Sequence, residues 1–128
     1  MRWLLSFWHN TLAYTRGEPP CAPSHLPAVV DTFSLCVFPD PGAALRSMAA
    51  CLRPGGTLLL LEHSRSTLVP LGWYQDITAP AVMATGKGCR WNDNVSQLVQ
   101  AAGLEIQQSE AHVGGLIVSV VAKKPTYP

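Results

Sequence analysis

Charged side chains are scarce in this sequence. They make up 13% of the 128 residues, the net charge is +1, and no block of like charges occurs. Because binding to nucleic acid depends on clustered lysine and arginine, this pattern argues against a nucleic-acid partner. Apolar residues make up 48% of the chain, which is typical of a sequence that folds around a core and not of a disordered one.

Cysteine pairs with the spacing of zinc ligands are also absent. The four cysteines are widely separated and form no C-x-x-C motif. Cys21 and His25 are the nearest approach to a ligand pair, and no second pair complements them. The sequence therefore predicts no metal site, and we interpret the cysteines as reduced residues that pack in the core or in loops.

No uninterrupted apolar run is long enough to span a bilayer, which takes about 20 residues. The uncharged run within residues 1–16 falls short of that length and lacks the small-residue cleavage site of a secretory signal. Acidic residues are absent before Glu18. Two interpretations of this opening segment stay open: an amphipathic organelle-targeting segment, and a short surface or core helix.

A strand, a helix and a second strand follow one another in the first half of the chain. Residues 28–34 are rich in β-forming side chains. Residues 41–52 carry apolar side chains at helical spacing, with Asp40 as the expected N-cap. Residues 57–61 are apolar throughout, which is typical of a central strand in a covered parallel sheet. This order is that of a βαβ unit, so the predicted fold class is α/β.

The second half of the chain contains two helical regions and a hairpin, at residues 64–85, 92–102 and 104–122. Pro70 and Pro80 interrupt the first region, which predicts one or two short helices there. Asn92 or Asp93 is the expected cap of the second helix. The predicted hairpin pairs strands 104–112 and 116–122 across a turn at the two glycines 114 and 115.

Polar side chains stand at the ends of the two predicted parallel strands. Asp31 lies near the end of the first strand, and Glu62 and His63 end the second. Ligands of open α/β sheets bind outside these carboxyl ends, so we expect a site here. A histidine at such a position acts as a general base near neutral pH or orients a substrate. The alternatives, that Asp31 caps nearby amides and that His63 bonds a neighbouring turn, stay open.

The segment Leu-Arg-Pro-Gly-Gly at residues 52–56, followed by an apolar strand, resembles the late motif of class I S-adenosylmethionine-dependent methyltransferases. The run from Val29 to Cys36, the strand-ending Glu62-His63 and the later Gly-Lys-Gly-Cys-Arg-Trp-Asn segment resemble a narrower group of small-molecule enzymes. That group is related to quinone C-methyltransferases and membrane-associated thiol methyltransferases. The resemblance covers residues 26–124.

The resemblance implies a partial Rossmann-like sheet made of the late strands, with helices on both faces and a closing antiparallel hairpin. Residues 26–124 are then the C-terminal half of a methyltransferase domain, residues 1–25 are unassigned and residues 125–128 are a tail. It also implies S-adenosylmethionine as cofactor and a small, lipophilic acceptor. The expected location is intracellular, either mitochondrial or membrane-associated, with peripheral membrane contact.

Three groups of site residues follow from the same resemblance. They are Asp31, Thr32 and Phe33 for the methionine end of the cofactor, Glu62 and His63 for catalysis, and Cys36, Trp73, Tyr74 and Trp91 for an apolar substrate pocket. For the aromatic residues and Cys36, the alternative of plain packing stays open.

One element of the family is not in this sequence. The G-x-G-x-G loop, whose glycines let the backbone approach the cofactor, does not occur. The segment at residues 86–88, Gly-Lys-Gly, is the only nearby pattern, and no predicted strand precedes it. Because methyl transfer depends chiefly on aligning cofactor and acceptor, we expect little activity from this chain alone.

Two hypotheses of different kinds follow from the absent loop. In the first, the remaining half of an enzyme lies outside this chain or on a partner chain. In the second, the chain is a catalytically inactive binding or assembly module. Without the first three strands of the family's sheet, the strand at residues 28–34 becomes an apolar sheet edge, which the side chains of Trp3, Leu4, Phe7 and Trp8 are expected to cover.

Overall fold

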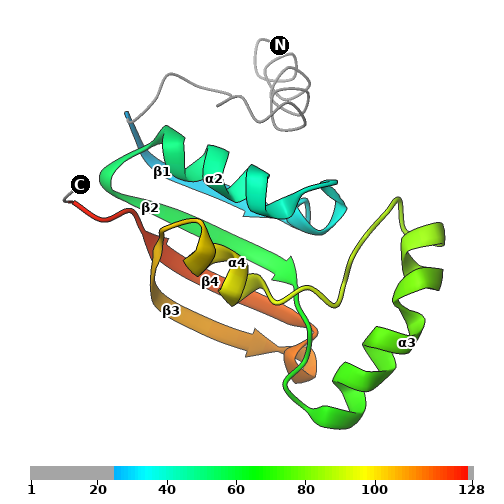
Figure 1. The fold of residues 1–128 in the computed structure, drawn as a ribbon. Coiled ribbons are helices and arrows are strands. Elements are labelled where there is room, and N and C mark those ends of the chain that lie inside the picture. The colour runs from blue at the N-terminus through cyan, green and yellow to red at the C-terminus, as the bar shows by residue number, and fades with distance from the viewer. Residues whose placement is uncertain (1–24, 127–128) are drawn as a thin grey trace.

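The computed structural model describes residues 25–126, which form a four-stranded sheet in the order β1-β2-β4-β3. Strand β1 (Leu26–Thr32) pairs in parallel with β2 (Leu52–His63). Strand β4 (Ile117–Lys123) runs antiparallel to both β2 and β3 (Glu105–His112), as Figure 1 shows. The α/β class and the closing antiparallel hairpin are confirmed.

Helix α2 (Pro41–Cys51) begins as the sequence predicts. Oδ1 of Asp40 accepts a hydrogen bond of 2.9 Å from the amide of Ala43, and a proline follows at the first helical position. A short 3₁₀ helix, η1 (Leu35–Val37), lies between β1 and α2. The local signals of capping and apolar spacing therefore determine where this helix starts.

The core lies between one face of the sheet and two helices, α2 and α4 (Val95–Ala101). Its most completely buried side chains come from both layers: Leu45, Leu52, Leu58, Val99 and Val120. Helices were expected on both faces of the sheet, and among the described residues α2 and α4 share one face (Figure 1). Helix α3 (Val69–Thr85) extends from the sheet beyond the end of β2.

The opposite face of the sheet carries exposed apolar side chains. Val30 on β1 is 65% exposed and Leu59 on β2 is 37% exposed. Within the described part of the chain, β1 pairs with β2 alone, so it forms the predicted sheet edge. The expected covering by residues 3–8 lies outside the described residues.

Strand β2 is longer than predicted, because it includes the Pro-Gly-Gly segment expected to be a turn before the strand. The pairing with β1 shifts between Leu26 opposite Leu52 and Ala28 opposite Thr57, which accommodates the extra residues as a bulge. Gly55 has a φ of 74°, a backbone conformation that a residue with a Cβ rarely adopts.

Helix α3 is one continuous helix through Pro80, whereas the sequence suggested an interruption there. Pro80 is exposed, so the carbonyl of Asp76 that loses its amide partner can be hydrated. Helix α4 begins later than predicted, because Asn94 is its cap and accepts from the amide of Gln97 at 3.1 Å. No described helix is long and apolar enough to cross a membrane.

Candidate functional site

Glu62 lies at the end of β2 with no solvent exposure. Its Oε1 accepts hydrogen bonds from the backbone amides of Ser34 at 3.0 Å and Leu35 at 3.2 Å. Both amides belong to the turn that follows β1. The resemblance predicts a catalytic role for Glu62, and the structure places its carboxyl group inside, where it anchors this turn.

Asp31 and Glu62 form a buried pair of carboxyl groups. Burial raises the pKa of Asp31. Burial and the nearby charge of Asp31 raise the pKa of Glu62 to about 7. The hydroxyl of Ser34 donates to Oδ1 of Asp31, while Oδ2 of Asp31 and Oε2 of Glu62 are buried without a donor. A proton shared between the two carboxyl groups accounts for both orphaned oxygens.

His63 lies beside two buried thiols. Its Nδ1 is 3.7 Å from Sγ of Cys36 and 3.7 Å from Sγ of Cys89, and the two sulfur atoms are 3.1 Å apart. Burial raises the pKa of the Cys36 thiol to about 12. The ring of Phe33 stands 5.0 Å from the His63 ring.

Cys51 differs from the expectation of reduced cysteines, because it is disulfide-bonded.

Arg90 joins the Cys89 loop to the segment that carries Cys36. Its amide donates to the carbonyl of Cys36 at 2.9 Å. Its guanidinium donates to the carbonyls of Phe38 at 2.7 Å and Pro39 at 3.0 Å. These three hydrogen bonds fix the position of one thiol relative to the other.

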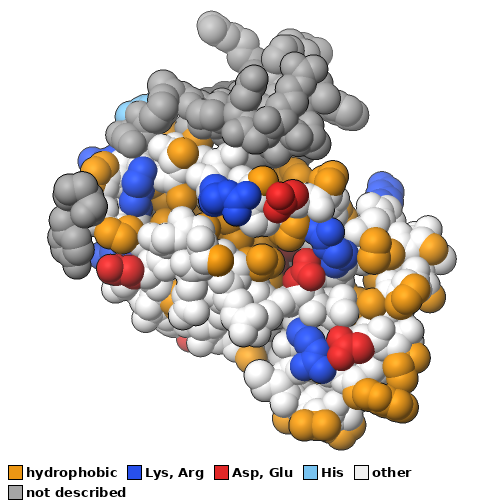
Figure 2. Space-filling model, viewed as in Figure 1, with side chains coloured by type: hydrophobic (Ala, Val, Ile, Leu, Met, Phe, Trp, Pro, Cys, Tyr) orange, Lys and Arg blue, Asp and Glu red, His pale blue; other side chains and the backbone are white. Residues whose placement is uncertain are grey.

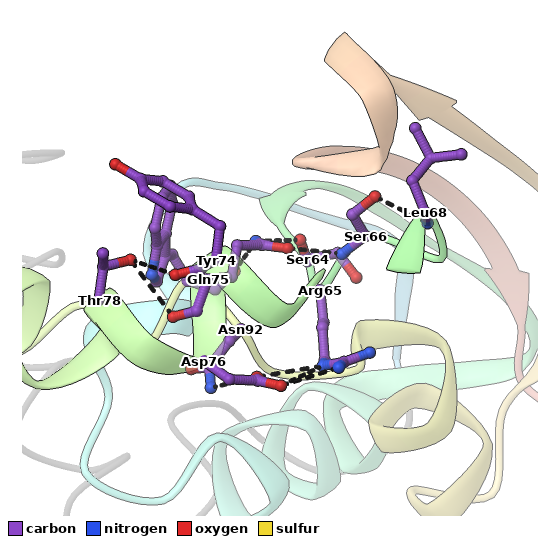
Figure 3. A network of polar contacts seen from close by, with 10 residues as sticks. Ser64, Arg65, Ser66, Leu68, Tyr74, Gln75, Asp76, Thr78 and Asn92 are labelled. Carbon is purple, nitrogen blue, oxygen red and sulfur yellow. Dashed lines mark hydrogen bonds and ion pairs between the residues drawn. The ribbon is translucent and has the colours of Figure 1, made fainter. Parts of the chain in front are cut away.

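Gln75 attaches helix α3 to the rest of the molecule, as Figure 3 shows. Its side chain is fully buried. Oε1 accepts from the amide of Ser66 at 2.7 Å, and Nε2 donates to the carbonyls of Ser64 at 2.9 Å and Trp91 at 2.8 Å. No motif in the sequence marks Gln75. Gln75 lies three residues after Gly72 and four before Ala79, so helical spacing places it on the inward face of α3 with these two buried residues. This spacing is the signal by which the sequence could have pointed to Gln75.

Replacing Gln75 by leucine is expected to loosen α3 without unfolding the sheet. The change leaves three backbone groups without their partner, which costs about 1–3 kcal/mol for a group that stays buried. Faster amide hydrogen exchange confined to α3 and residues 64–66 would support this. Gln100→Leu, at an exposed position of helix α4, is the matched control. Unchanged exchange in α3 would contradict the attachment.

A second, exposed contact lies next to Gln75. The guanidinium of Arg65 donates to both carboxylate oxygens of Asp76 at 2.8–3.2 Å, and the amide of Asn92 donates to the same group at 3.2 Å (Figure 3). The hydrogen bond from Arg65 lowers the pKa of Asp76. This contact ties α3 to the loop before α4.

Helix α3 presents an apolar face to solvent. Val69 is 81% exposed, Trp73 66% and Ile77 58%, and their spacing of four residues places them on one stripe. Hydrophobic side chains gather over this helix in Figure 2. Tyr74 is also exposed, and its ring meets that of Trp91 edge-on at 6.1 Å.

The structure thus separates the predicted site residues into smaller groups. Asp31 pairs with Glu62, and Thr32 is exposed beside them. Cys36 joins His63 and not the aromatic residues of α3 with which it was expected to form a pocket.

A hollow of about 340 Å³ lies at the opposite end of the sheet from the carboxyl pair. Its walls are Arg46, Ala49, Ala50, Ala102, Gly103, Leu104, Lys124 and Pro125. None of the predicted site residues lines it.

A family profile described as "Methyltransferase domain" matches residues 18–109. The chain belongs to this methyltransferase family. It is 31% identical over 96 residues to "Methyltransferase OMS1, mitochondrial" of Saccharomyces cerevisiae, a stretch that is 75% of this chain and 20% of the yeast protein. It is 27% identical over 110 residues to the ubiquinone/menaquinone biosynthesis C-methyltransferase UbiE of Vibrio cholerae, covering 86% of this chain and 42% of that protein.

Solved structures confirm the methyltransferase fold. A methyltransferase from Bacillus halodurans superposes with a TM-score of 0.66 at 14% identity, covering 86% of this chain and 69% of that one. An S-adenosylmethionine-dependent methyltransferase from Thermotoga maritima has a TM-score of 0.60 at 14% identity and covers 96% and 93%. The chain therefore has a Rossmann-like methyltransferase fold, and it spans 20% of the length of the yeast relative and 42% of that of the Vibrio relative.

Proposed function

We propose that this chain forms the acceptor side of a methyltransferase domain that transfers a methyl group from S-adenosylmethionine to a small, lipophilic acceptor. The main support for this proposal is the stripe of exposed apolar side chains on α3, formed by Val69, Trp73 and Ile77, because a lipophilic acceptor binds against apolar side chains. The helix follows the carboxyl end of β2, where ligands of α/β sheets bind.

The residues at the end of β1 fit one side of the cofactor. Asp31 stands at the carboxyl end of β1, where ligands of α/β sheets bind, and the cationic methionine end of the cofactor would favour the ionised form of its carboxyl group over the proton that it shares with Glu62. Thr32 and Phe33 are exposed next to it, and Phe33 has a φ of 52°. We assign these three residues to the cofactor wall. The bound cofactor supplies an already activated methyl group, so the protein has only to align the acceptor and exclude water.

Glu62 and His63 have different roles in this proposal. Glu62 is a positioning residue, because its carboxyl group holds the turn that carries Phe33 and Ser34. His63 is half-buried beside that turn and keeps the role of general base or acceptor-orienting group. Trp73, Tyr74 and Trp91 then provide the apolar surface for the acceptor.

The relatives support the finer parts of the proposal. UbiE is named as a ubiquinone/menaquinone biosynthesis enzyme, which favours a quinone-like acceptor here. OMS1 is named as mitochondrial, which favours that location.

A structural neighbour from Haloferax volcanii, similar in fold alone, is bound to the activator Trm112. By analogy, a partner chain or a preceding segment completes the cofactor site here. The apolar stripe of α3 is the surface for peripheral membrane contact.

Binding of a fully substituted alkyl quinone, which cannot add to thiols, tests the acceptor assignment. The double variant Trp73→Ser/Ile77→Ser is expected to lower the affinity at least about 10-fold, because each large apolar side chain contributes about 1.5–3 kcal/mol when covered. The control Gln100→Ser on α4 should leave the affinity unchanged. Equal quinone affinity in the double variant and the control, measured by calorimetry, would contradict the proposal.

A further inference from the structure

Two cysteines and a histidine from three separate segments converge next to the carboxyl pair. Cys36 lies in η1, His63 ends β2, and Cys89 lies in the loop after α3. Their three ligand atoms all lie within 4.8 Å of one another. No short sequence motif links them, since they are separated by 27 and 26 positions.

The distances within this Cys-His-Cys cluster are close to those around a tetrahedral metal ion. Zinc lies about 2.3 Å from sulfur and about 2.0–2.1 Å from nitrogen, which places a nitrogen and a sulfur ligand about 3.6 Å apart and two sulfur ligands about 3.8 Å apart. Both distances from Nδ1 of His63 are 3.7 Å. The sulfur atoms, 3.1 Å apart, have to separate by about 0.7 Å.

A disulfide between Cys36 and Cys89 explains the three distances within the cluster less well than a bound metal ion does. It requires the sulfur atoms to approach to about 2.05 Å, and it gives the imidazole no role. The equal distances of Nδ1 from the two sulfur atoms are those expected when all three ligands surround one point.

The cluster is held in place by contacts from outside it. Glu62 bonds the two amides that precede Cys36. Arg90 joins the Cys89 loop to η1 through the carbonyls of Cys36, Phe38 and Pro39. Such supporting contacts orient the ligands of metal sites. They bring the three side chains together before any ion binds.

We propose that Cys36, His63 and Cys89 bind one divalent cation of the zinc class. Thiolate and imidazole are the ligands that zinc prefers, and two thiolates balance the charge of the ion. Binding releases the protons of the two thiols to solvent. Three protein ligands leave a fourth position for water or another small ligand, and His63, bound through Nδ1, keeps its Nε2. The inference does not depend on methyl transfer.

Titration of the full chain with Co²⁺ tests the site, after metal has been removed with a chelator and under mild conditions that keep the Cys36 and Cys89 thiols free and leave the Cys51 disulfide intact. The expected result is a one-to-one complex with a thiolate-to-cobalt charge-transfer band and the visible absorption of tetrahedral Co²⁺. Zn²⁺ should displace the cobalt and raise the melting temperature of the folded chain. A folded chain with both thiols free that binds neither ion would overturn the proposal.

Ligand variants distinguish this site from binding elsewhere on the chain. Cys36→Ala, Cys89→Ala and His63→Gln are each expected to abolish the one-to-one complex and the gain in melting temperature. The control is His112→Gln, an exposed histidine on β3 that bonds the hydroxyl of Ser119. Circular dichroism checks that each variant is folded. Stoichiometric binding that persists in a folded Cys36→Ala/Cys89→Ala double variant would refute the assignment.

Discussion

Replacing Glu62 by alanine is expected to lower the free energy of unfolding by about 2–6 kcal/mol. The buried amides of Ser34 and Leu35 each lose their acceptor, and a buried group left unpaired costs about 1–3 kcal/mol. The removed side chain also leaves a space, because Glu62 is completely buried. Urea denaturation followed by circular dichroism measures this change.

The conservative variant Glu62→Gln separates the role of the hydrogen bonds from that of the charge. Its Oε1 can accept from the same two amides, and its Nε2 can donate to Asp31 in place of the shared proton. The expected loss of stability is about 1 kcal/mol or less. If alanine and glutamine destabilised the chain equally, the anchoring of the turn after β1 by this carboxyl group would be wrong.

The second large effect concerns two neighbouring leucines on β2. Leu58 has no solvent exposure and packs in the core beneath α2 and α4, whereas Leu59 is 37% exposed on the other face. Leu58→Ala is expected to cost about 2–5 kcal/mol. Leu59→Ala should cost less than about 1 kcal/mol in this chain, because it removes contacts at a surface.

The same pair of variants reports on the uncovered face of the sheet. If a partner chain or a preceding segment covers Val30 and Leu59, the cost of Leu59→Ala should rise in the assembled protein, because that side chain is then removed from water. The midpoint of urea denaturation, measured with and without the additional segment, checks this. Equal costs for both variants in the isolated chain would contradict the assignment of the two faces.

Local sequence signals were sufficient to predict the first half of the fold. Asp40 and the following proline mark the start of α2, and the apolar spacing of its side chains identifies the buried face. The apolar run after the two glycines identifies the central strand β2. These features depend on neighbouring residues in the chain, which is why they can be read without coordinates.

The features that escaped the sequence analysis depend on contacts between distant segments. Gln75 bonds residues 9, 11 and 16 positions away, and no local pattern marks its partners. The Cys-His-Cys cluster was missed for the same reason, since metal-site motifs are recognised from ligands close in sequence. Pro80 predicted a helix break, yet α3 continues through it. The helix continues because Pro80 is exposed, which permits hydration of the freed carbonyl, and exposure is a tertiary property that the sequence does not reveal.

Titration of the isotopically labelled chain with S-adenosylhomocysteine, followed by amide chemical shifts, tests whether the ends of β1 and β2 form one wall of the cofactor site. Without a glycine-rich loop in this chain, the expected affinity is in the millimolar range, about −4 kcal/mol. We expect shifts at residues 31–36 and 62–64 and none at residues 102–104, which line the hollow at the opposite end of the sheet. A folded chain whose amides do not shift at residues 31–36, or shift only at residues 102–104, would refute the assignment of the cofactor wall to the end of β1.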